Sequence, residues 1–311
     1  MSNAHLIQKA RPETADVLVI GAGASGSVAV RELVQQGFNV VCLEQGDWTP
    51  ATEFTGDKPE WELTRQKQWH PNPNVRQNPS DYRVNTDDSD VNPLMFNAVG
   101  GSTILYAAHW CRALPSDFQV RSQDGVADDW PFAYEDLLPF YLEIERDMAV
   151  SGLSGNTAYP ESGSYPLPPL PIGKYGHKAA SGMNKLGWHW WPGANSIASK
   201  ATGHRAQCLR YGACLTGCPA GAKASTDLTH WPYALELGAH LVTGARVSEI
   251  TVNDQGLATG ANYIDRDGAE HHQKAKVVVV AGNGLGTPRL LLLSKSGSHP
   301  DGLGNSSGLV G

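Results

Sequence analysis

The sequence contains no long hydrophobic run and relatively little charge. Its longest apolar stretches are VVVVA at residues 277–281 and LLLL at residues 290–293, and both are too short to span a bilayer. No apolar stretch precedes the first predicted strand, so no signal peptide is visible and we expect a cytoplasmic protein. Charged residues make up 18% of the chain and the net charge is −7, without long runs of one sign. Nucleic acid and anionic membrane surfaces are therefore not expected partners.

Cysteine is also scarce, and its distribution suits a metal or cluster site better than a disulfide framework. The chain has 5 cysteines, an odd number, and three of them lie between Cys208 and Cys218. Such crowding favours a metal or cluster site, whereas Cys42 and Cys111 have the pattern of ordinary buried thiols. With 311 residues and 41% hydrophobic content, the chain can bury a core of one large domain or two smaller ones.

The N-terminal part predicts a nucleotide-binding unit. An apolar strand is predicted at Asp16–Ile20, a helix at Ser25–Gln36 with Gly37 after it as a C-cap, and a second strand at Val40–Leu43. Strand, tight glycine turn, helix and strand within about 30 residues are typical of a right-handed βαβ unit with a parallel sheet.

The glycine turn of this unit has the spacing that a dinucleotide requires. Gly21 permits the tight turn, Gly23 lets the backbone approach a pyrophosphate at the helix N-terminus, and Gly26 lets helix and strand pack closely. Glu44, at the end of the second strand, can accept hydrogen bonds from a ribose hydroxyl. This unit alone leaves NAD and FAD open as the ligand.

Two stretches predict little regular structure. Residues 48–93 are rich in Pro, Asn and Asp, and they predict an extended loop with a short helical piece near Trp61–Trp69. Residues 151–176 are dense in Pro, Gly and Ser and predict a long irregular excursion.

The last third predicts a β-meander that leads into a buried parallel strand. A second glycine turn, Gly282–Gly286, then opens a leucine-rich helix with Thr287 as N-cap and Pro288 at the first helical position. The meander and this second turn favour the flavoprotein version of the fold. The predicted strands are Leu241–Thr243, Arg246–Val252, Ala258–Asp265, Ala269–Lys274 and the fully apolar Val277–Ala281.

Three segments resemble the glucose-methanol-choline (GMC) oxidoreductases. They are VLVIGAGASGSVAVRELVQQGFNVVCLEQG from Val17, NAVGGSTILYAAHWCRALPSDF from Asn97, and VVVVAGNGLGTPRLLLLS from Val277. The resemblance implies an α/β fold: a FAD-binding, Rossmann-like ββα sandwich with a β-meander, plus an incomplete, largely irregular substrate-side region. It places the FAD-binding domain at residues 12–50, 94–115 and 238–311, and the cap or substrate-side region at residues 51–93 and 116–237.

The resemblance also implies which residues contact the cofactor. In this family the GGS[ST] segment runs beside the flavin, so Gly100–Thr103 should contact the pyrophosphate or ribityl chain, and Tyr106–His109 should face the isoalloxazine edge. The full implied set is Gly21, Gly23, Ala24, Ser25, Gly26, Glu44, Gln45, Gly100, Gly101, Ser102, Thr103, Tyr106, Ala107, His109, Val247, Ala281, Gly282 and Asn283.

The chain departs from the family pattern at two places. Tyr106 stands where members often have Asn, which changes the polar contact near the flavin. Ile104 and Leu105 stand near the position where some members attach flavin through a His, so we expect non-covalent FAD. His109 is the only histidine inside a matched flavin-side motif, and it is a candidate for proton transfer; a packed, hydrogen-bonded side chain is the alternative.

The cysteine segment has two possible ligands. The spacing of Cys208, Cys214 and Cys218, with Pro219 after the last, is similar to ferredoxin-type ligation of an iron-sulfur cluster. The segment resembles that of bacterial flavin glucose and fructose dehydrogenases, which pass electrons from FAD through such a cluster to a cytochrome. Zinc would need a fourth ligand, for which His204 is available, and buried thiols in a loop remain an alternative.

The resemblance leaves the catalytic residues unassigned. The His pair or His-Asn pair that deprotonates the substrate in this family lies in a C-terminal part that has no counterpart here, so we expect a fragment, a truncated product or one half of a split enzyme. The expected function is oxidation of a CH–OH group of an alcohol or sugar by hydride transfer to FAD. A FAD-binding electron-transfer half, working with a complementary polypeptide or an electron-accepting subunit, and an NAD-dependent dehydrogenase are the alternatives.

Overall fold

A computed structural model describes residues 11–160 and 163–311 of the chain. Residues 1–10, on which the prediction of no signal peptide partly rests, lie outside the described residues. The chain divides into two compact units, which are treated separately below. The larger unit comprises the chain up to Tyr106 together with Leu215–Pro219 and Ser225–Gly311, and the smaller unit comprises Ala107–Cys214 and Ala220–Ala224.

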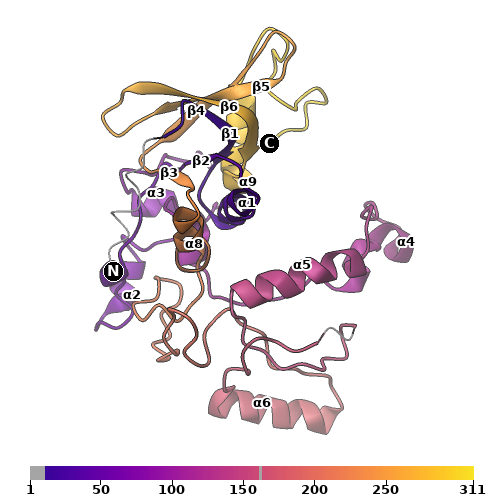
Figure 1. Ribbon diagram of the computed structural model, residues 1–311. Helices are drawn as coiled ribbons and strands as arrows, with labels where there is room; N and C mark the ends of the chain where they lie inside the picture. The colour runs from indigo at the N-terminus through magenta and orange to yellow at the C-terminus, as the bar shows by residue number, and fades with distance from the viewer. Residues whose placement is uncertain (1–10, 161–162) are drawn as a thin grey trace. The chain divides into compact units, whose positions relative to one another are not determined.

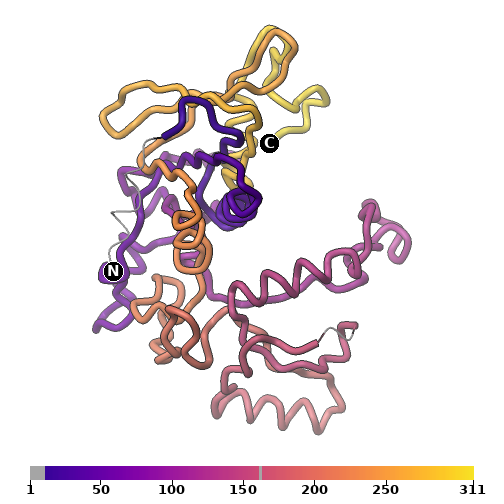
Figure 2. The backbone as a smooth tube through the Cα atoms, viewed as in Figure 1, coloured from indigo at the N-terminus to yellow at the C-terminus, as the bar shows by residue number. Residues whose placement is uncertain are grey.

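The larger unit is built on one mixed sheet of six strands in the order β3-β2-β1-β6-β5-β4 (Figure 1). The four strands β3, β2, β1 and β6 are parallel, and β5 and β4 join the edge of β6 as an antiparallel meander. Figure 2 shows the early β1 segment running beside the late β6 segment, in agreement with the register Val17↔Val277 to Ile20↔Val280. The strands are β1 Thr14–Ile20, β2 Val40–Leu43, β3 His240–Val242, β4 Arg246–Val252, β5 Ala258–Ile264 and β6 Glu270–Val280.

Helices cover both faces of this sheet, because its central strands are apolar on both sides. On one face Val17 and Val19 pack against the helices α1 and α8, and on the other Leu18 and Ile20 pack toward Leu290 of α9. The predicted α/β class, with a Rossmann-like parallel sheet and a β-meander, is confirmed. The helices of this unit are α1 Ala24–Gln35, α2 Trp61–Arg65, α3 Pro73–Arg76, α7 Thr226–Thr229, α8 Trp231–Glu236 and α9 Asn283–Leu293, with 3-10 turns at Ala51–Glu53 and Gly101–Ile104.

Two predictions about the late elements are wrong. The strands expected at Ala269–Lys274 and Val277–Ala281 form the single strand β6, because the intervening Lys276 points outward and pairs with Asp16 at 2.7 Å. This strand is not fully buried either. Val277 is 53% exposed, because beyond Lys274 the strand is paired only with β1 in the described part of the chain.

The start of the last helix also differs from the prediction. Helix α9 begins at Asn283, and Pro288 lies inside it, so Thr287 is not the N-cap. The reason is that the Asn283 side chain accepts hydrogen bonds from the backbone N–H groups of Leu285 and Gly286, at 2.8 and 3.0 Å. These bonds satisfy N–H groups of the first turn four residues earlier than expected.

The smaller unit is more helical than its composition predicts. Helix α6 begins at Gly173, inside the stretch expected to be irregular, and Cys111 is exposed instead of buried. A buried ion pair organises the unit: Arg112 donates two hydrogen bonds to Glu145, at 2.7 and 2.6 Å, and one to Tyr134 at 3.1 Å. Its elements are a 3-10 turn at Pro115–Phe118 and the helices α4 Val120–Asp124, α5 Tyr134–Asp147 and α6 Gly173–Leu186 (Figure 1).

The boundaries of the compact units differ from the predicted domain boundaries. Residues 51–93 and 225–237 belong to the larger unit, although the prediction placed them in the substrate-side region. Arg76 illustrates the reason, since it is buried and donates to the carbonyl of Met95 at 3.0 Å, beside the predicted cofactor segment. The functional division into a cofactor domain and a substrate-side region stays a prediction.

Candidate cofactor-binding site

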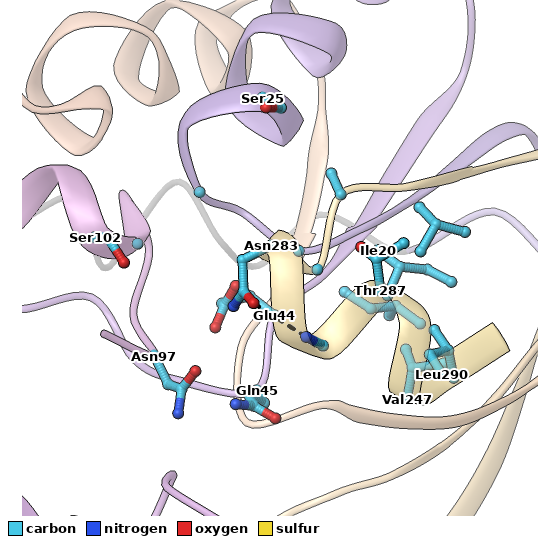
Figure 3. Close-up of a pocket in the computed structure, with 18 of the residues that line it drawn as sticks. Ile20, Ser25, Glu44, Gln45, Asn97, Ser102, Val247, Asn283, Thr287 and Leu290 are labelled. Carbon is cyan, nitrogen blue, oxygen red and sulfur yellow. Dashed lines mark hydrogen bonds between the residues drawn. The ribbon is translucent and has the colours of Figure 1, made fainter. Parts of the chain in front are cut away.

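A pocket of about 590 Å³ lies in the larger unit, where β1, β2 and β6 end. This is the size expected for a small-molecule or cofactor site, and its position follows the general rule for parallel sheets. Figure 3 shows Ser25, Glu44, Ser102, Val247 and Asn283 among the side chains around it. The structure brings together these predicted residues in the lining: Gly21, Gly23, Ala24, Ser25, Glu44, Gln45, Gly101, Ser102, Thr103, Tyr106, Val247, Ala281, Gly282 and Asn283.

The N-terminus of α1 opens onto this pocket with its positive end available. Gly23 is the N-cap residue, and within the described chain no side chain caps the helix and no acidic residue occupies its first turn. Gly23, Ala24 and Ser25 all line the pocket. The helix dipole and the free backbone N–H groups therefore favour an anionic group of a ligand here.

The glycine turn at Gly21–Gly26 and the glycine pair Gly100–Gly101 pack backbone against backbone beside the N-terminus of α1. The Gly100 N–H donates to the Ala22 carbonyl at 2.9 Å, and a Cβ on Gly101 would lie only 2.8 Å from the Gly23 Cα. Gly26 has the predicted packing role, since a Cβ there would lie 1.9 Å from the Gly21 carbonyl oxygen. The close contact leaves the pocket wall free of side chains at these positions.

Glu44 is a buried carboxylate that ties two turns together. One oxygen accepts the Ala22 N–H at 2.8 Å and the other accepts the Gly46 N–H at 2.9 Å. Burial raises the pKa of this carboxyl above its ordinary value, and the backbone N–H groups of Ala22, Gly46 and Gln45 oppose that shift. The carboxylate keeps acceptor capacity on each oxygen, so a ribose hydroxyl can still donate to it.

Trp231 and Thr226, which sequence reasoning missed, support the turns from behind. Trp231 of α8 is fully buried, and its indole N–H donates to the Ala22 carbonyl at 2.9 Å. The hydroxyl of the predicted Thr103 donates to the Gly100 carbonyl at 2.5 Å and accepts the Thr226 N–H at 3.1 Å. The contacts of Trp231 and Thr226 join residues more than 100 positions apart in the chain, so no local pattern indicates them.

The glycine turn at Gly282–Gly286 differs chemically from the turn at Gly21–Gly26. Asn283 has a backbone φ of +65°, and its side-chain oxygen caps two N–H groups of α9, as described above. Those N–H groups are consequently not available to a ligand. The sequence predicted two similar phosphate-side turns, and in the described chain they differ: no side chain caps the α1 end, whereas the Asn283 side chain accepts two N–H groups at the α9 end.

Five further residues complete the lining, and sequence reasoning missed all of them. Tyr82 lies in the irregular segment, while Phe96 and Asn97 lie directly before the predicted Gly100–Thr103 segment. Arg246 of β4 and Arg289 of α9 supply the two cationic side chains among the described lining residues. The available signs were the position of Asn97 at the start of a matched motif and that of Arg246 next to the predicted Val247.

Four predicted residues do not line the pocket. Gly26 and Gly100 act in turn packing, and Ala107 and His109 belong to the smaller unit. Within that unit His109 forms an isolated antiparallel bridge with Asn195, and its ring Nδ1 lies 3.8 Å from the Cys111 sulfur. A proton-transfer role for His109 stays a prediction.

The cysteine segment is divided between the units. Cys208 and Cys214 belong to the smaller unit and Cys218 to the larger one. Within residues 11–160 and 163–311, no three His, Cys, Asp or Glu side chains gather closely enough to hold a metal ion. The structure thus gives no support to a metal at Cys208, Cys214 and Cys218, with or without His204.

A dinucleotide fits the chemistry of the pocket. An uncapped helix end, a wall of glycine backbone at Gly21, Gly23 and Gly101, and a carboxylate at Glu44 meet around one cavity. These features suit a pyrophosphate and a ribose. The fold and the pocket together define a Rossmann-like dinucleotide-binding protein.

Two family profiles match parts of the chain. A profile described as "NAD(P)-binding Rossmann-like domain" matches residues 19–52, and one described as "GMC oxidoreductase" matches residues 169–309. The match over residues 169–309 agrees with the resemblance to the GMC oxidoreductases that the sequence motifs carry.

Two curated relatives and one solved structure illustrate the similarity. The chain is 45% identical to 2-methyl-1,2-propanediol dehydrogenase of Mycolicibacterium austroafricanum, over 95% of this chain and 54% of that protein. It is 31% identical to the fructose dehydrogenase large subunit of Gluconobacter japonicus, over 96% of this chain and 57% of that protein. A structure of an Aspergillus oryzae RIB40 formate oxidase variant, whose description concerns the effect of the mutation on FAD modification, shares the fold with a TM-score of 0.58. The two chains are 14% identical, over 92% of this chain and 48% of that one. The chain thus spans about half the length of the relatives it matches.

None of the helices in the described part of the chain combines the length and the apolar character needed to cross a membrane.

Proposed function

We propose that this chain binds FAD and forms the cofactor-binding part of an oxidoreductase that oxidises a CH–OH group of an alcohol or sugar. The observation that carries the proposal is the meeting of the uncapped α1 N-terminus with the glycine wall and Glu44 around one pocket. The match to the GMC oxidoreductase profile and a solved neighbour whose description names FAD support the choice of FAD over NAD.

Each part of the pocket has a distinct task in this proposal. The N–H groups of Gly23, Ala24 and Ser25 hold the pyrophosphate, and Glu44 accepts hydrogen bonds from the ribose. Ser102, Thr103 and Tyr106 lie on the wall that the family resemblance assigns to the flavin side. FAD, when bound, supplies the hydride acceptor, and the protein supplies orientation and exclusion of water.

The substrate class is inferred from the relatives. Their names specify a diol and a sugar, which are both CH–OH compounds, and the identity reaches 45% with the diol enzyme. No catalytic base is assigned within this chain, where His109 is the one candidate for proton transfer inside a matched motif.

A second function is an electron-transferring, FAD-binding half that acts only with a partner polypeptide. The relative named as a large subunit favours it, since that protein belongs to an assembly of subunits. An iron-sulfur cluster at Cys208, Cys214 and Cys218 would belong to this version. The thiolates would hold it, and electrons leaving the flavin would pass through it.

The test is a visible absorption spectrum of the purified chain, followed by turnover with diols and sugars. Flavin bands that survive gel filtration and disappear on denaturation support FAD binding, whereas a chain that binds NAD and no flavin overturns it. Turnover by the chain alone would overturn the second function. Restoration of turnover only by an added partner polypeptide would support that function.

The cluster is tested by metal analysis of anaerobically purified protein. About three or four irons per chain with matching sulfide support a cluster, and Cys214→Ser should then lose iron while keeping FAD. About one zinc without sulfide would indicate zinc instead, and His204→Ala should release it. If the analysis finds neither iron nor zinc, and the thiols titrate freely after unfolding, the cysteine segment is a loop without a metal.

A further inference from the structure

Arg289 is a pocket cation whose charge the described chain does not neutralise. It lies in α9, and Figure 3 shows its helix neighbours Thr287 and Leu290 among the side chains at the pocket. Its guanidinium lies over the ring of Tyr82, 4.9 Å from the ring centroid. No hydrogen bond or ion pair involves this guanidinium among residues 11–160 and 163–311. Its five N–H donors are therefore available to a ligand.

The loop anchors residues on both sides of Tyr82, whose ring lies under Arg289. On one side of Tyr82, Asp81 accepts two hydrogen bonds from the buried Arg76, at 3.0 and 2.5 Å. On the other side, Val84 exchanges backbone hydrogen bonds with the Asn74 amide, at 2.9 and 2.7 Å. Tyr82 thus sits between two anchored residues, and its ring offers a fixed platform for a guanidinium.

The distribution of charge in the lining specifies the kind of ligand group that Arg289 meets. Glu44 is the only acidic residue of the lining, and both of its oxygens already accept backbone N–H groups. At the α9 N-terminus the Asn283 side chain already accepts the Leu285 and Gly286 N–H groups, so those two groups are not available to an anion. An anionic ligand group in this pocket has the α1 N-terminus on one element, Arg289 on α9 and the second lining cation, Arg246, on β4.

We propose that Arg289 is a further cofactor-binding residue, which contacts a phosphate of the bound dinucleotide, and that Tyr82 is the positioning residue that holds its guanidinium over the pocket. The inference rests on the proposed function, because it requires a dinucleotide in this site. Guanidinium groups bind phosphate with two parallel hydrogen bonds, and stacking on an aromatic ring limits the freedom lost in doing so.

The experiment measures FAD binding to the flavin-free 311-residue chain by flavin fluorescence, at two salt concentrations. Arg289→Ala should raise the Kd roughly tenfold at low salt and weaken its salt dependence, as for loss of one exposed charge-assisted contact. The matched control is Arg83→Ala, which removes an exposed arginine beside Tyr82 that does not line the pocket. It should leave the Kd within about twofold.

Competition by nucleotides separates charge from packing. Arg289→Ala should weaken the binding of ADP, which carries the pyrophosphate, while leaving the binding of adenosine unchanged. Tyr82→Phe should bind FAD like wild type, and Tyr82→Ala should resemble Arg289→Ala. The double Ala variant should lose less than the sum of the two single effects, because both act through one contact.

The outcomes distinguish the two proposals. A wild-type chain that binds no FAD overturns the proposed function and this inference together. Wild-type binding with an unchanged Kd in Arg289→Ala overturns the inference alone, and so does an equal loss for ADP and adenosine. If circular dichroism shows that Arg289→Ala is misfolded, Arg289→Gln, which keeps most of the side chain without its charge, provides the same comparison.

Discussion

The Glu44 carboxylate accepts a hydrogen bond from the Ala22 backbone N–H at 2.8 Å, across 22 residues of chain. The contact ties the end of β2 to the glycine turn at the start of α1. Glu44 therefore shapes the glycine turn, a role separate from its proposed contact with a ribose. Replacing it with Ala should weaken FAD binding and also destabilise the flavin-free chain, since a buried N–H loses its acceptor.

The pH dependence of stability should report the burial of Glu44. Burial raises its pKa in the folded chain above the ordinary 4.5. Its contribution to stability is therefore full below the ordinary pKa and is lost as the pH rises through the folded-state pKa. Glu44→Gln does not titrate. Relative to wild type, its free energy of unfolding should rise between about pH 4 and pH 7 in urea titrations of the flavin-free chain. If the difference in the free energy of unfolding between Glu44→Gln and wild type stays constant across that range, the raised pKa of Glu44 is contradicted.

Two glycines of the same turn should respond differently to alanine. A Cβ on Gly26 would lie 1.9 Å from the Gly21 carbonyl oxygen, so Gly26→Ala should destabilise the fold by about 1–3 kcal/mol or more and lose FAD. A Cβ on Gly23 would meet nothing closer than the Gly101 Cα at 3.8 Å. Gly23→Ala should consequently fold normally and lose only FAD affinity, with a still greater loss for Gly23→Val.

Chemical denaturation and FAD titration of the same preparations separate these effects. Gly182→Ala is the matched control, because this helical glycine has nothing within 4 Å of its built Cβ. It should stabilise the chain by about 0.5–1 kcal/mol and leave FAD binding unchanged. Tight FAD binding by Gly23→Val would remove this turn from the site.

Asn283 should contribute to stability through its cap. Asn283→Ala removes the acceptor for two N–H groups and places Ala at a φ of +65°, so a loss of about 1–2 kcal/mol is expected in denaturant titrations. Asn283→Asp keeps the acceptor and should lose little. Asn283→Gly removes the cap without strain, and its loss should fall between the two. Equal stability of the Ala and Asp variants would show that the cap is unimportant.

The buried Arg112–Glu145 ion pair should contribute far more to the stability of the chain than a surface ion pair does. Its side chains are 6% and 2% exposed, and hydrogen bonds to Glu145 and Tyr134 outweigh the effect of burial, so the pKa of Arg112 is raised. Glu145→Ala should destabilise the chain by about 3–5 kcal/mol, since it leaves a buried guanidinium uncompensated. Lys276→Ala breaks the exposed pair with Asp16 and should change stability by less than about 1 kcal/mol. Similar thermal shifts for the two variants would contradict this difference.

Local patterns in the sequence predicted the cofactor unit well. The bounds of β2 and β4 agree with the prediction to the residue, and Gly37 follows α1 with a φ of +85°, because strand runs and helix caps are determined by neighbouring residues. The predicted role of Gly26 depends on backbone sterics within one turn, since its built Cβ would lie 1.9 Å from the Gly21 carbonyl oxygen. Gly21 has a positive φ of +101°, as a tight turn requires, but its built Cβ meets the Ala281 carbonyl at 2.6 Å, a contact that only the folded sheet creates.

Contacts between distant segments were decided by the tertiary structure. Tyr82 and Arg289 lie about 200 positions apart, and each has an unremarkable sequence context, yet they meet at 4.9 Å in the pocket wall. Asn283 was predicted as a pocket residue, but whether its amide caps α9 or faces a ligand depends on its backbone φ. The sequence by itself determined the glycine turns and most of the strands, because these depend on short-range sterics and periodicity. Only the folded chain decided which arginines line the pocket and which aromatic ring lies under one of them, because long-range packing sets where each side chain finds its partner.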